Sequence, residues 1–131
     1  MACRISELVL DCVDPEGLAA FWCAVLGYVE LDREPDGSIE IGPPTGFGGP
    51  QSTLVLSPTA DPRPAKLRLH LDISPTDRDQ AAELVRLLDL GARHADIGQT
   101  GEEPWYPLLD PEGNEFCLLR QRIEPVTAPA S

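Results

Sequence analysis

The chain has 131 residues, of which 42% are hydrophobic, so it can bury the core of one compact domain. Its formal net charge of −12 at pH 7 disfavours nucleic acids and anionic membranes as partners, because both are bound by clustered lysine and arginine. No apolar stretch approaches the roughly 20 residues of a membrane span. Since no secretion signal precedes the first predicted strand, we expect a cytoplasmic protein.

The first predicted elements are a strand at Ile5–Cys12 and a helix. The strand alternates between a more polar face and an apolar one. The two faces consist of Glu7, Val9 and Asp11 on one side, and Leu8, Leu10 and Cys12 on the other. Asp14-Pro15 is a typical helix start, because Asp caps free N–H groups and Pro loses no needed hydrogen bond there. An apolar stripe at helical spacing and then Gly27 predict that the helix ends at Leu26.

Three short strands are predicted next, at residues 28–31, 38–41 and 52–57, with a turn at 34–37. The stretch 42–50 is rich in glycine and proline and predicts a long loop. Phe47 lies on this loop and could act as a lid over a ligand, since loops of this length are often functional. The proline-rich residues 58–65 predict a linker.

The second half of the chain repeats this order of one strand, one helix and three short strands. A strand is predicted at Lys66–Ile73, with Arg68, His70 and Asp72 on its polar face and Leu67, Leu69, Leu71 and Ile73 on its apolar face. Ser74-Pro75 or Thr76 is expected to cap a helix that runs to about Leu90. The residues that we expect it to bury are Ala81, Leu84, Val85, Leu87 and Leu88. Strands at 92–95, 105–109 and 115–119 follow, with a tight turn at 110–114 and a flexible tail at 121–131.

The two halves form an internal repeat. Leu26-Gly27 and Leu90-Gly91 are 64 residues apart, and Glu7 and His70 are 63 apart. This predicts an α+β fold of two βαβββ modules, residues 4–57 and 66–120, within a single domain of residues 4–120. If each helix covers the leucine-rich face of its sheet, the polar faces would line one cup-shaped groove. Polar groups that converge in an apolar groove are the default ligand site.

Four stretches of the chain resemble the vicinal-oxygen-chelate superfamily, and within it the glyoxalase-like domains and bleomycin resistance proteins. The stretches are Leu8–Pro15, Ala20–Trp22 with Leu26-Gly27, Arg68–Asp72, and Asp110–Cys117. The resemblance implies the glyoxalase/bleomycin resistance/dioxygenase fold of paired modules around a mixed, cup-shaped sheet. The superfamily includes lyases, isomerases, epimerases, extradiol dioxygenases and thiol transferases, and also metal-free proteins that sequester drugs.

The resemblance also implies where a metal would bind, because metal-using members hold a divalent ion with four strand residues, usually His, Gln or Glu. These positions fall on Glu7, His70, Cys117 and a residue near Leu54, in any register among residues 53–56. Of the last group only Thr53 could ligate, and only weakly. We therefore expect no metal. The alternative is a zinc site of Glu7, His70 and Cys117, because thiolate is a soft ligand.

The remaining candidate ligand-binding residues each have a structural alternative. Arg68 could hold an anionic group, or it could pair with Asp72 or Glu7. Cys117 could be a nucleophile activated by the neighbouring histidine, although buried cysteines more often only pack. Trp105 could stack on a flat ligand or belong to the core.

These residues predict a protein that binds a small hydrophobic or aromatic molecule in the groove without a metal, with drug sequestration as one version. The alternative is a glyoxalase-type lyase or isomerase in which His70 and Glu7 form an acid–base pair, with or without a divalent metal. A structural or partner-binding domain is a third possibility. The resemblance also implies a homodimer.

Overall fold

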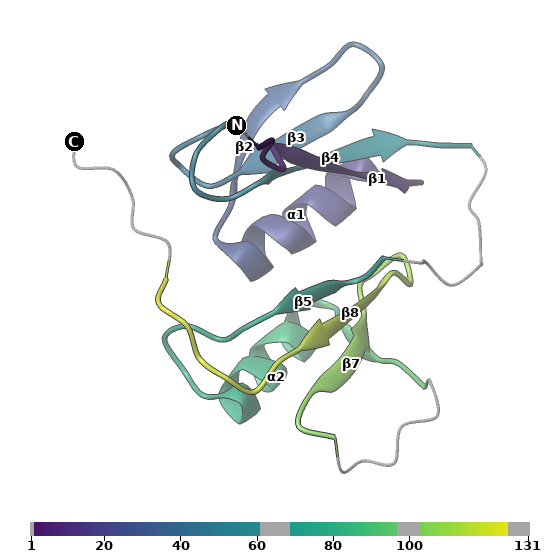
Figure 1. The fold of residues 1–131 in the computed structure, drawn as a ribbon. Coiled ribbons are helices and arrows are strands. Elements are labelled where there is room, and N and C mark those ends of the chain that lie inside the picture. The colour runs from purple at the N-terminus through teal and green to yellow at the C-terminus, as the bar shows by residue number, and fades with distance from the viewer. Residues whose placement is uncertain (1, 61–68, 97–102, 126–131) are drawn as a thin grey trace. The chain divides into compact units, whose positions relative to one another are not determined.

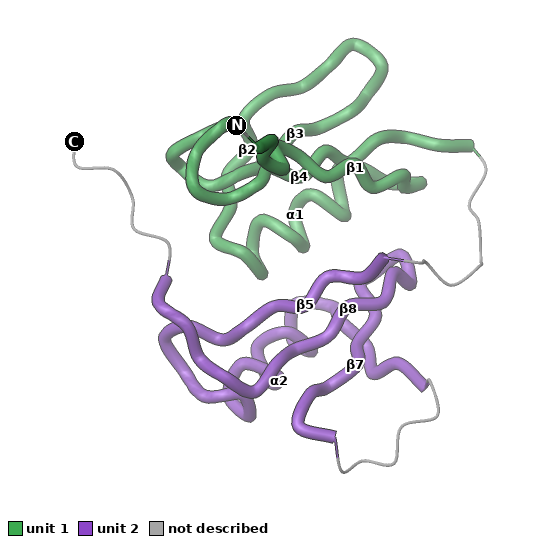
Figure 2. The backbone as a smooth tube through the Cα atoms, viewed as in Figure 1, with its two compact units in different colours: residues 1–63, 126–131 green, residues 64–125 purple. Residues whose placement is uncertain are grey.

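The computed structural model describes residues 2–60, 69–96 and 103–125. They form two compact units, which Figure 2 colours separately: residues 2–60 belong to unit 1, and residues 69–96 and 103–125 belong to unit 2. Within the described residues each unit has one helix and four strands, as the repeat predicts (Figure 1). Unit 1 consists of β1 (Glu7–Cys12), α1 (Pro15–Leu26), β2 (Val29–Arg33), β3 (Ile39–Gly42) and β4 (Thr53–Pro58). Unit 2 consists of β5 (Leu71–Ile73), α2 (Gln80–Leu90), β6 (Arg93–His94), β7 (Tyr106–Leu109) and β8 (Glu115–Leu118).

The sheet of unit 1 has the strand order β1-β4-β3-β2, with β1 parallel to β4 and the other neighbours antiparallel. Glu7 pairs with Thr53 and Leu8 with Leu54, so the predicted alternation assigns these pairs to opposite faces. Helix α1 contacts β2, β3 and β4. Leu54 is buried beneath it, whereas Glu7 is exposed. We call the face that carries Glu7 and Thr53 the helix-free face of unit 1.

Helix α1 begins and ends as its local sequence predicts. The side chain of Asp14 accepts a hydrogen bond from the N–H of Gly17 at 3.2 Å, and Pro15 is the first helical residue. Gly27 ends the helix with a φ of 68°, a conformation that other residues rarely adopt. Leu18 and Trp22 are fully buried against the sheet. These local signals therefore suffice to place the helix and its apolar stripe.

The sheet of unit 2 has the equivalent order β5-β8-β7-β6, with β5 parallel to β8. Helix α2 is tied to β8, because Nε2 of Gln80 donates to the carbonyl of Leu118 at 3.2 Å. Phe116 and Leu118 of β8 are fully buried. Between them Cys117 points to the opposite side, in register with Asp72 on β5 and Pro107 on β7. We call that side the helix-free face of unit 2.

The described part of the predicted strand at Lys66–Ile73 is shorter than predicted, because residues 69 and 70 are not in a strand. Residues 66–68 lie outside the described residues, and the ladder begins only at Leu71. Leu69, expected on the apolar face, is 82% exposed. The reason is the parallel register: Asn114, which would face Leu69, belongs to the β7–β8 turn and donates its N–H to Asp110. Among the described residues, Leu69 therefore lies outside the ladder, which begins at Leu71.

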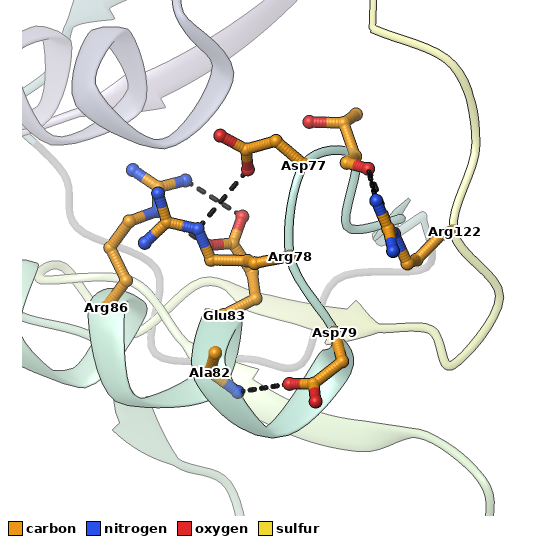
Figure 3. Close-up of polar contacts among 8 residues, drawn as sticks. Asp77, Arg78, Asp79, Ala82, Glu83, Arg86 and Arg122 are labelled. Carbon is orange, nitrogen blue, oxygen red and sulfur yellow. Dashed lines mark hydrogen bonds and ion pairs between the residues drawn. The ribbon is translucent and has the colours of Figure 1, made fainter.

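The predicted start of α2 is also wrong. Asp79, not Ser74-Pro75 or Thr76, caps the helix by accepting from the N–H of Ala82 at 2.8 Å (Figure 3). The residues before it are engaged by the start of the C-terminal tail. The guanidinium of Arg122 donates to the carbonyl of Thr76, and the N–H of Ile123 donates to the carbonyl of Pro75. The start of the predicted flexible tail, residues 121–125, is thus hydrogen-bonded to the segment before α2. Residues 126–131 lie outside the described residues.

The buried side of α2 differs from the predicted one. Leu87 is fully buried, but Val85 is 59% exposed and Ala81 is exposed. Glu83 is buried instead, because the guanidinium of Arg86 donates to both of its carboxylate oxygens, at 2.5 and 2.9 Å (Figure 3). A carboxylate can replace an apolar residue in the stripe only when it is paired in this way.

The turn at 110–114 forms as predicted and joins β7 to β8. Asp110 is fully buried, and its carboxylate accepts from the N–H groups of Glu112 and Asn114 and from the side-chain amide of Asn114. This turn sets the register of β8 and so the position of Cys117. Among the described residues, neither helix has the length and apolarity that crossing a membrane requires.

Candidate functional site

Unit 2 brings together His70, Asp72 and Cys117 on its helix-free face. One potential ligand atom from each residue, a ring nitrogen, a carboxylate oxygen and Sγ, lies within 4.8 Å of the other two. Nε2 of His70 is 3.1 Å from Oδ1 of Asp72. The side chains of His70 and Asp72 are 43% and 50% exposed, whereas Cys117 is buried. The cluster therefore has a thiol at its base and an imidazole and a carboxylate at its rim.

The strands explain this arrangement. His70 and Asp72 are two positions apart at the start of β5, so they point to the same side of the sheet. Asp72 pairs with Cys117 across the parallel β5–β8 ladder, and paired residues share a face. The predicted pair His70 and Cys117 is confirmed as a spatial pair. Asp72, expected on the same face but not chosen as a site residue, joins them.

The equivalent place in unit 1 has different chemistry. Glu7 is exposed on the helix-free face and pairs with Thr53. Thr53 is fully buried, and its hydroxyl donates to Oε2 of Glu40 on β3 at 2.7 Å. The register shows that Val55 shares this face, whereas Leu54 and Leu56 are buried on the helix side. Unit 1 therefore supplies two carboxylates and a hydroxyl there.

The opposite edge of the unit 1 sheet is crowded with negative charge. Asp32, by repulsion and by a hydrogen bond, raises the pKa of the Glu34 carboxyl above its ordinary value, and Asp36 and Glu40 add to this effect. Glu40 pairs with Asp32 in the β2–β3 ladder. An anionic ligand would meet repulsion at this edge.

The loop that carries Phe47 is held in place at its base. The guanidinium of Arg4 donates to the carbonyls of Gly48 and Gly49, at 3.4 and 2.6 Å. Phe47 itself is 59% exposed, so its ring is not part of the core. An exposed ring on an anchored loop fits the predicted ligand contact, and its role as a lid stays a prediction.

The other predicted site residues lie in unit 2. Trp105, one residue before β7, is 41% exposed and is therefore not a core residue. Tyr106 packs edge-on against His94, with ring centroids 6.4 Å apart, on the side of the sheet that faces α2. Arg68 lies outside the described residues, so its predicted role stays a prediction.

Two residues of these faces were missed by sequence reasoning. Asp72 was recognised as polar and on the right face, but only the strand register shows that it adjoins Cys117. Glu40 follows the two-residue period of the β3 strand, so alternation between Ile39 and Ile41 could have drawn attention to it.

Comparisons with known proteins agree with this architecture. Residues 7–119 match the family model described as a glyoxalase-like domain. A comparison with curated proteins finds no match. Solved structures provide fold relatives at low identity, which therefore bear on the fold alone.

Three of these relatives cover nearly all of the chain. The fosfomycin resistance protein FosX from Listeria monocytogenes, solved with Mn(II) and sulfate, has a TM-score of 0.65 at 16% identity, over 90% of this chain and 92% of that one. FosX from Mesorhizobium loti has a TM-score of 0.65 at 15% identity, over 91% and 92%. A glyoxalase/bleomycin resistance/dioxygenase family enzyme from Burkholderia phytofirmans PsJN has a TM-score of 0.64 at 17% identity, over 88% and 97%.

The strand order of both units, the internal repeat and the match over residues 7–119 lead to one assignment. The α+β prediction of two related modules is confirmed. The chain belongs to the glyoxalase-like domain family.

Proposed function

We propose that this protein binds a small, uncharged hydrophobic or aromatic molecule at the helix-free face of unit 2, with His70 and Asp72 supplying the polar contact. The observation that supports this most is the half-exposed His70–Asp72 pair, 3.1 Å apart, on a face that no helix of its unit covers. Ligand sites combine an apolar surface with a few placed polar groups, and this pair is such a group.

Exposed aromatic side chains would supply the apolar contact. Trp105 lies two positions before Pro107, which pairs with Cys117, and it is 41% exposed. Phe47 of unit 1 is 59% exposed on its anchored loop, and its contact with a ligand stays a prediction from the sequence. Flat rings gain from stacking on such side chains by about 0.5–1.5 kcal/mol beyond the area that they bury.

The charge of the chain favours an uncharged ligand over an anionic one. The formal net charge is −12, and the helix-free face of unit 1 carries Glu7, Glu40 and Asp32. FosX from Listeria monocytogenes has been solved with 1S,2S-dihydroxypropylphosphonic acid, an anionic phosphonate. For this chain we propose sequestration of a neutral drug-like molecule instead, because repulsion would weaken phosphonate binding.

Binding by hydrogen bonds and stacking requires no metal, and metal-free binding stays a prediction. The donor set nevertheless fits a divalent cation, because thiolate, imidazole and carboxylate together suit zinc. His70, Asp72 and Cys117 would hold it, and the metal would supply a Lewis acid that polarises a ligand oxygen.

The His70–Asp72 pair also supports a second candidate, a glyoxalase-type lyase or isomerase. A carboxylate oxygen 3.1 Å from Nε2 can orient the imidazole, which leaves Nδ1 able to accept a proton from a bound substrate. His70 would act as the base, and Asp72 would position it. The predicted pairing of His70 with Glu7 of unit 1 stays a prediction.

A ligand screen with matched histidine variants tests the binding proposal. A panel of neutral aromatic natural products is screened by thermal shift and by tryptophan fluorescence. His70→Ala should weaken binding of a hit by about tenfold or more, since a hydrogen bond is lost. His94→Ala is the control, because this second histidine lies on the side of the sheet that faces α2. Equal effects of the two variants, or no hit at all, would contradict the proposal.

Deuterium exchange separates binding from catalysis without knowledge of the product. A bound ligand is incubated with the protein in deuterated water, and mass spectrometry measures the deuterium that enters carbon positions. A general base should catalyse this exchange, and His70→Ala and Asp72→Asn should slow it while a binding-only protein shows none. Exchange that both variants leave unchanged would rule out His70 as the base.

A further inference from the structure

The strongest unassigned feature of the described residues is the donor set of unit 2, considered as a complete three-ligand metal site within one unit. The alternative zinc set that follows from the resemblance is Glu7, His70 and Cys117, with ligands from both halves of the chain. Within unit 2 the structure places Asp72 beside His70 and Cys117. Asp72 is therefore the residue that distinguishes the two possible sites.

The spacing of the donor atoms suits one zinc ion. Ligands at about 2.0–2.1 Å for nitrogen and oxygen and about 2.3 Å for sulfur stand about 3.3–3.6 Å apart in a tetrahedron. The imidazole nitrogen and carboxylate oxygen are 3.1 Å apart, and all three donor atoms lie within 4.8 Å of one another. Small side-chain rotations of the two half-exposed residues would close the set.

Charge and burial favour the same ion. One thiolate and one carboxylate neutralise the two charges of Zn²⁺, and neutral imidazole adds the third ligand. The soft thiolate favours zinc over manganese or magnesium. Cys117 is buried, whereas the other two side chains are about half exposed. The sulfur would therefore anchor the metal from below and leave its fourth position open to water or a ligand oxygen.

We propose that His70, Asp72 and Cys117 form a three-ligand zinc site built by the β5 and β8 strands of unit 2 alone, with an open fourth position. Zinc uptake does not depend on the aromatic ligand of the proposed function, so the two proposals can fail separately. If no organic ligand is found, the zinc proposal still predicts that the protein binds metal. If no zinc binds, the proposal of metal-free ligand binding still stands.

Metal titration of the untagged, reduced and EDTA-treated full chain tests the proposal. We expect one zinc per chain by elemental analysis. Cobalt substitution should give the near-ultraviolet thiolate charge-transfer band, which reports the sulfur ligand directly. Asp72→Asn and His70→Asn should each weaken zinc binding by at least about tenfold. Both side chains are half exposed, so these variants should fold. Cys117→Ser should abolish the charge-transfer band.

Matched variants make the result specific. Asp89→Asn removes an exposed carboxylate from α2 of the same unit, and Cys12→Ser alters a buried thiol of unit 1; both should bind zinc as the wild type does. No uptake by the wild type would overturn the proposal. Uptake that Asp72→Asn leaves unchanged, or that Glu7→Gln abolishes, would also overturn it, because the ligands would then not be those of unit 2 alone.

Discussion

Replacing Asp110 by alanine should lower the free energy of unfolding by about 3–5 kcal/mol. The carboxylate is fully buried and accepts from the N–H of Glu112 at 2.9 Å, the N–H of Asn114 at 3.0 Å and the amide of Asn114 at 2.9 and 3.1 Å. Hydrogen bonds to a charged group contribute about 1.5–3 kcal/mol each, and a buried donor without an acceptor costs about 1–3 kcal/mol. Because the turn can relax after the substitution, the loss in free energy of unfolding should be smaller than the summed cost of three unsatisfied donors.

Urea unfolding followed by far-ultraviolet circular dichroism measures this loss. With a slope of about 1–3 kcal/mol per molar urea, the midpoint should fall by about 2 M. Asp36→Ala is the matched control, because Asp36 occupies the β2–β3 turn but is exposed and accepts from the N–H of Ser38 at 2.9 Å. Its midpoint should move far less. A loss for Asp110→Ala below about 1 kcal/mol, or one equal to that of the control, would refute the reasoning.

Three further predictions concern α2, a thiol and assembly. Leu87→Ala should cost about 2–4 kcal/mol because the residue is fully buried, whereas Val85→Ala, 59% exposed, should stay within about 0.5 kcal/mol; equal losses in thermal melts would contradict the observed stripe. Burial, and then the charge of Glu30, raise the pKa of the Cys23 thiol, so less of it is thiolate at a given pH. Iodoacetamide at mildly alkaline pH should therefore label the exposed Cys3 before Cys23, and the reverse order would contradict this. The expected homodimer predicts twice the mass of the chain in light scattering, and a monomer at all concentrations would contradict it.

The two helix starts show what the sequence can predict about the fold. Asp14-Pro15 and Gly27 lie next to the apolar stripe, so local chemistry alone places both ends of α1. Before α2, several residues could cap, and the choice depends on the chain far away. The carbonyls of residues 75 and 76 accept hydrogen bonds from Ile123 and Arg122, and the helix is capped only at Asp79. A contact between segments so distant in sequence has no local signal.

In the candidate site, too, local sequence predicts some features, whereas others depend on contacts between distant segments. The two-residue alternation predicts His70 and Asp72 on one face of their strand, because this pattern depends only on local order, whereas Cys117 is predicted through the family resemblance. Alternation does not determine which residue of β8 lies beside which residue of β5. That register is set by the β7–β8 turn, and it brings Asp72 next to Cys117. Long-range pairing, rather than propensity, thus decides the donor set.

The parallel ladders between the first and last strand of each unit have a consequence for how the chain folds. Each ladder closes a loop of about 45 residues, a high contact order for so small a unit, so we expect folding to be slow compared with that of helical bundles. During synthesis unit 1 can complete its sheet once β4 has emerged from the ribosome, but unit 2 must wait for β8, near the end of the chain. Until then β5 and β7 lack the strand that lies between them, and a nascent chain stalled before Glu115 would expose both edges to aggregation.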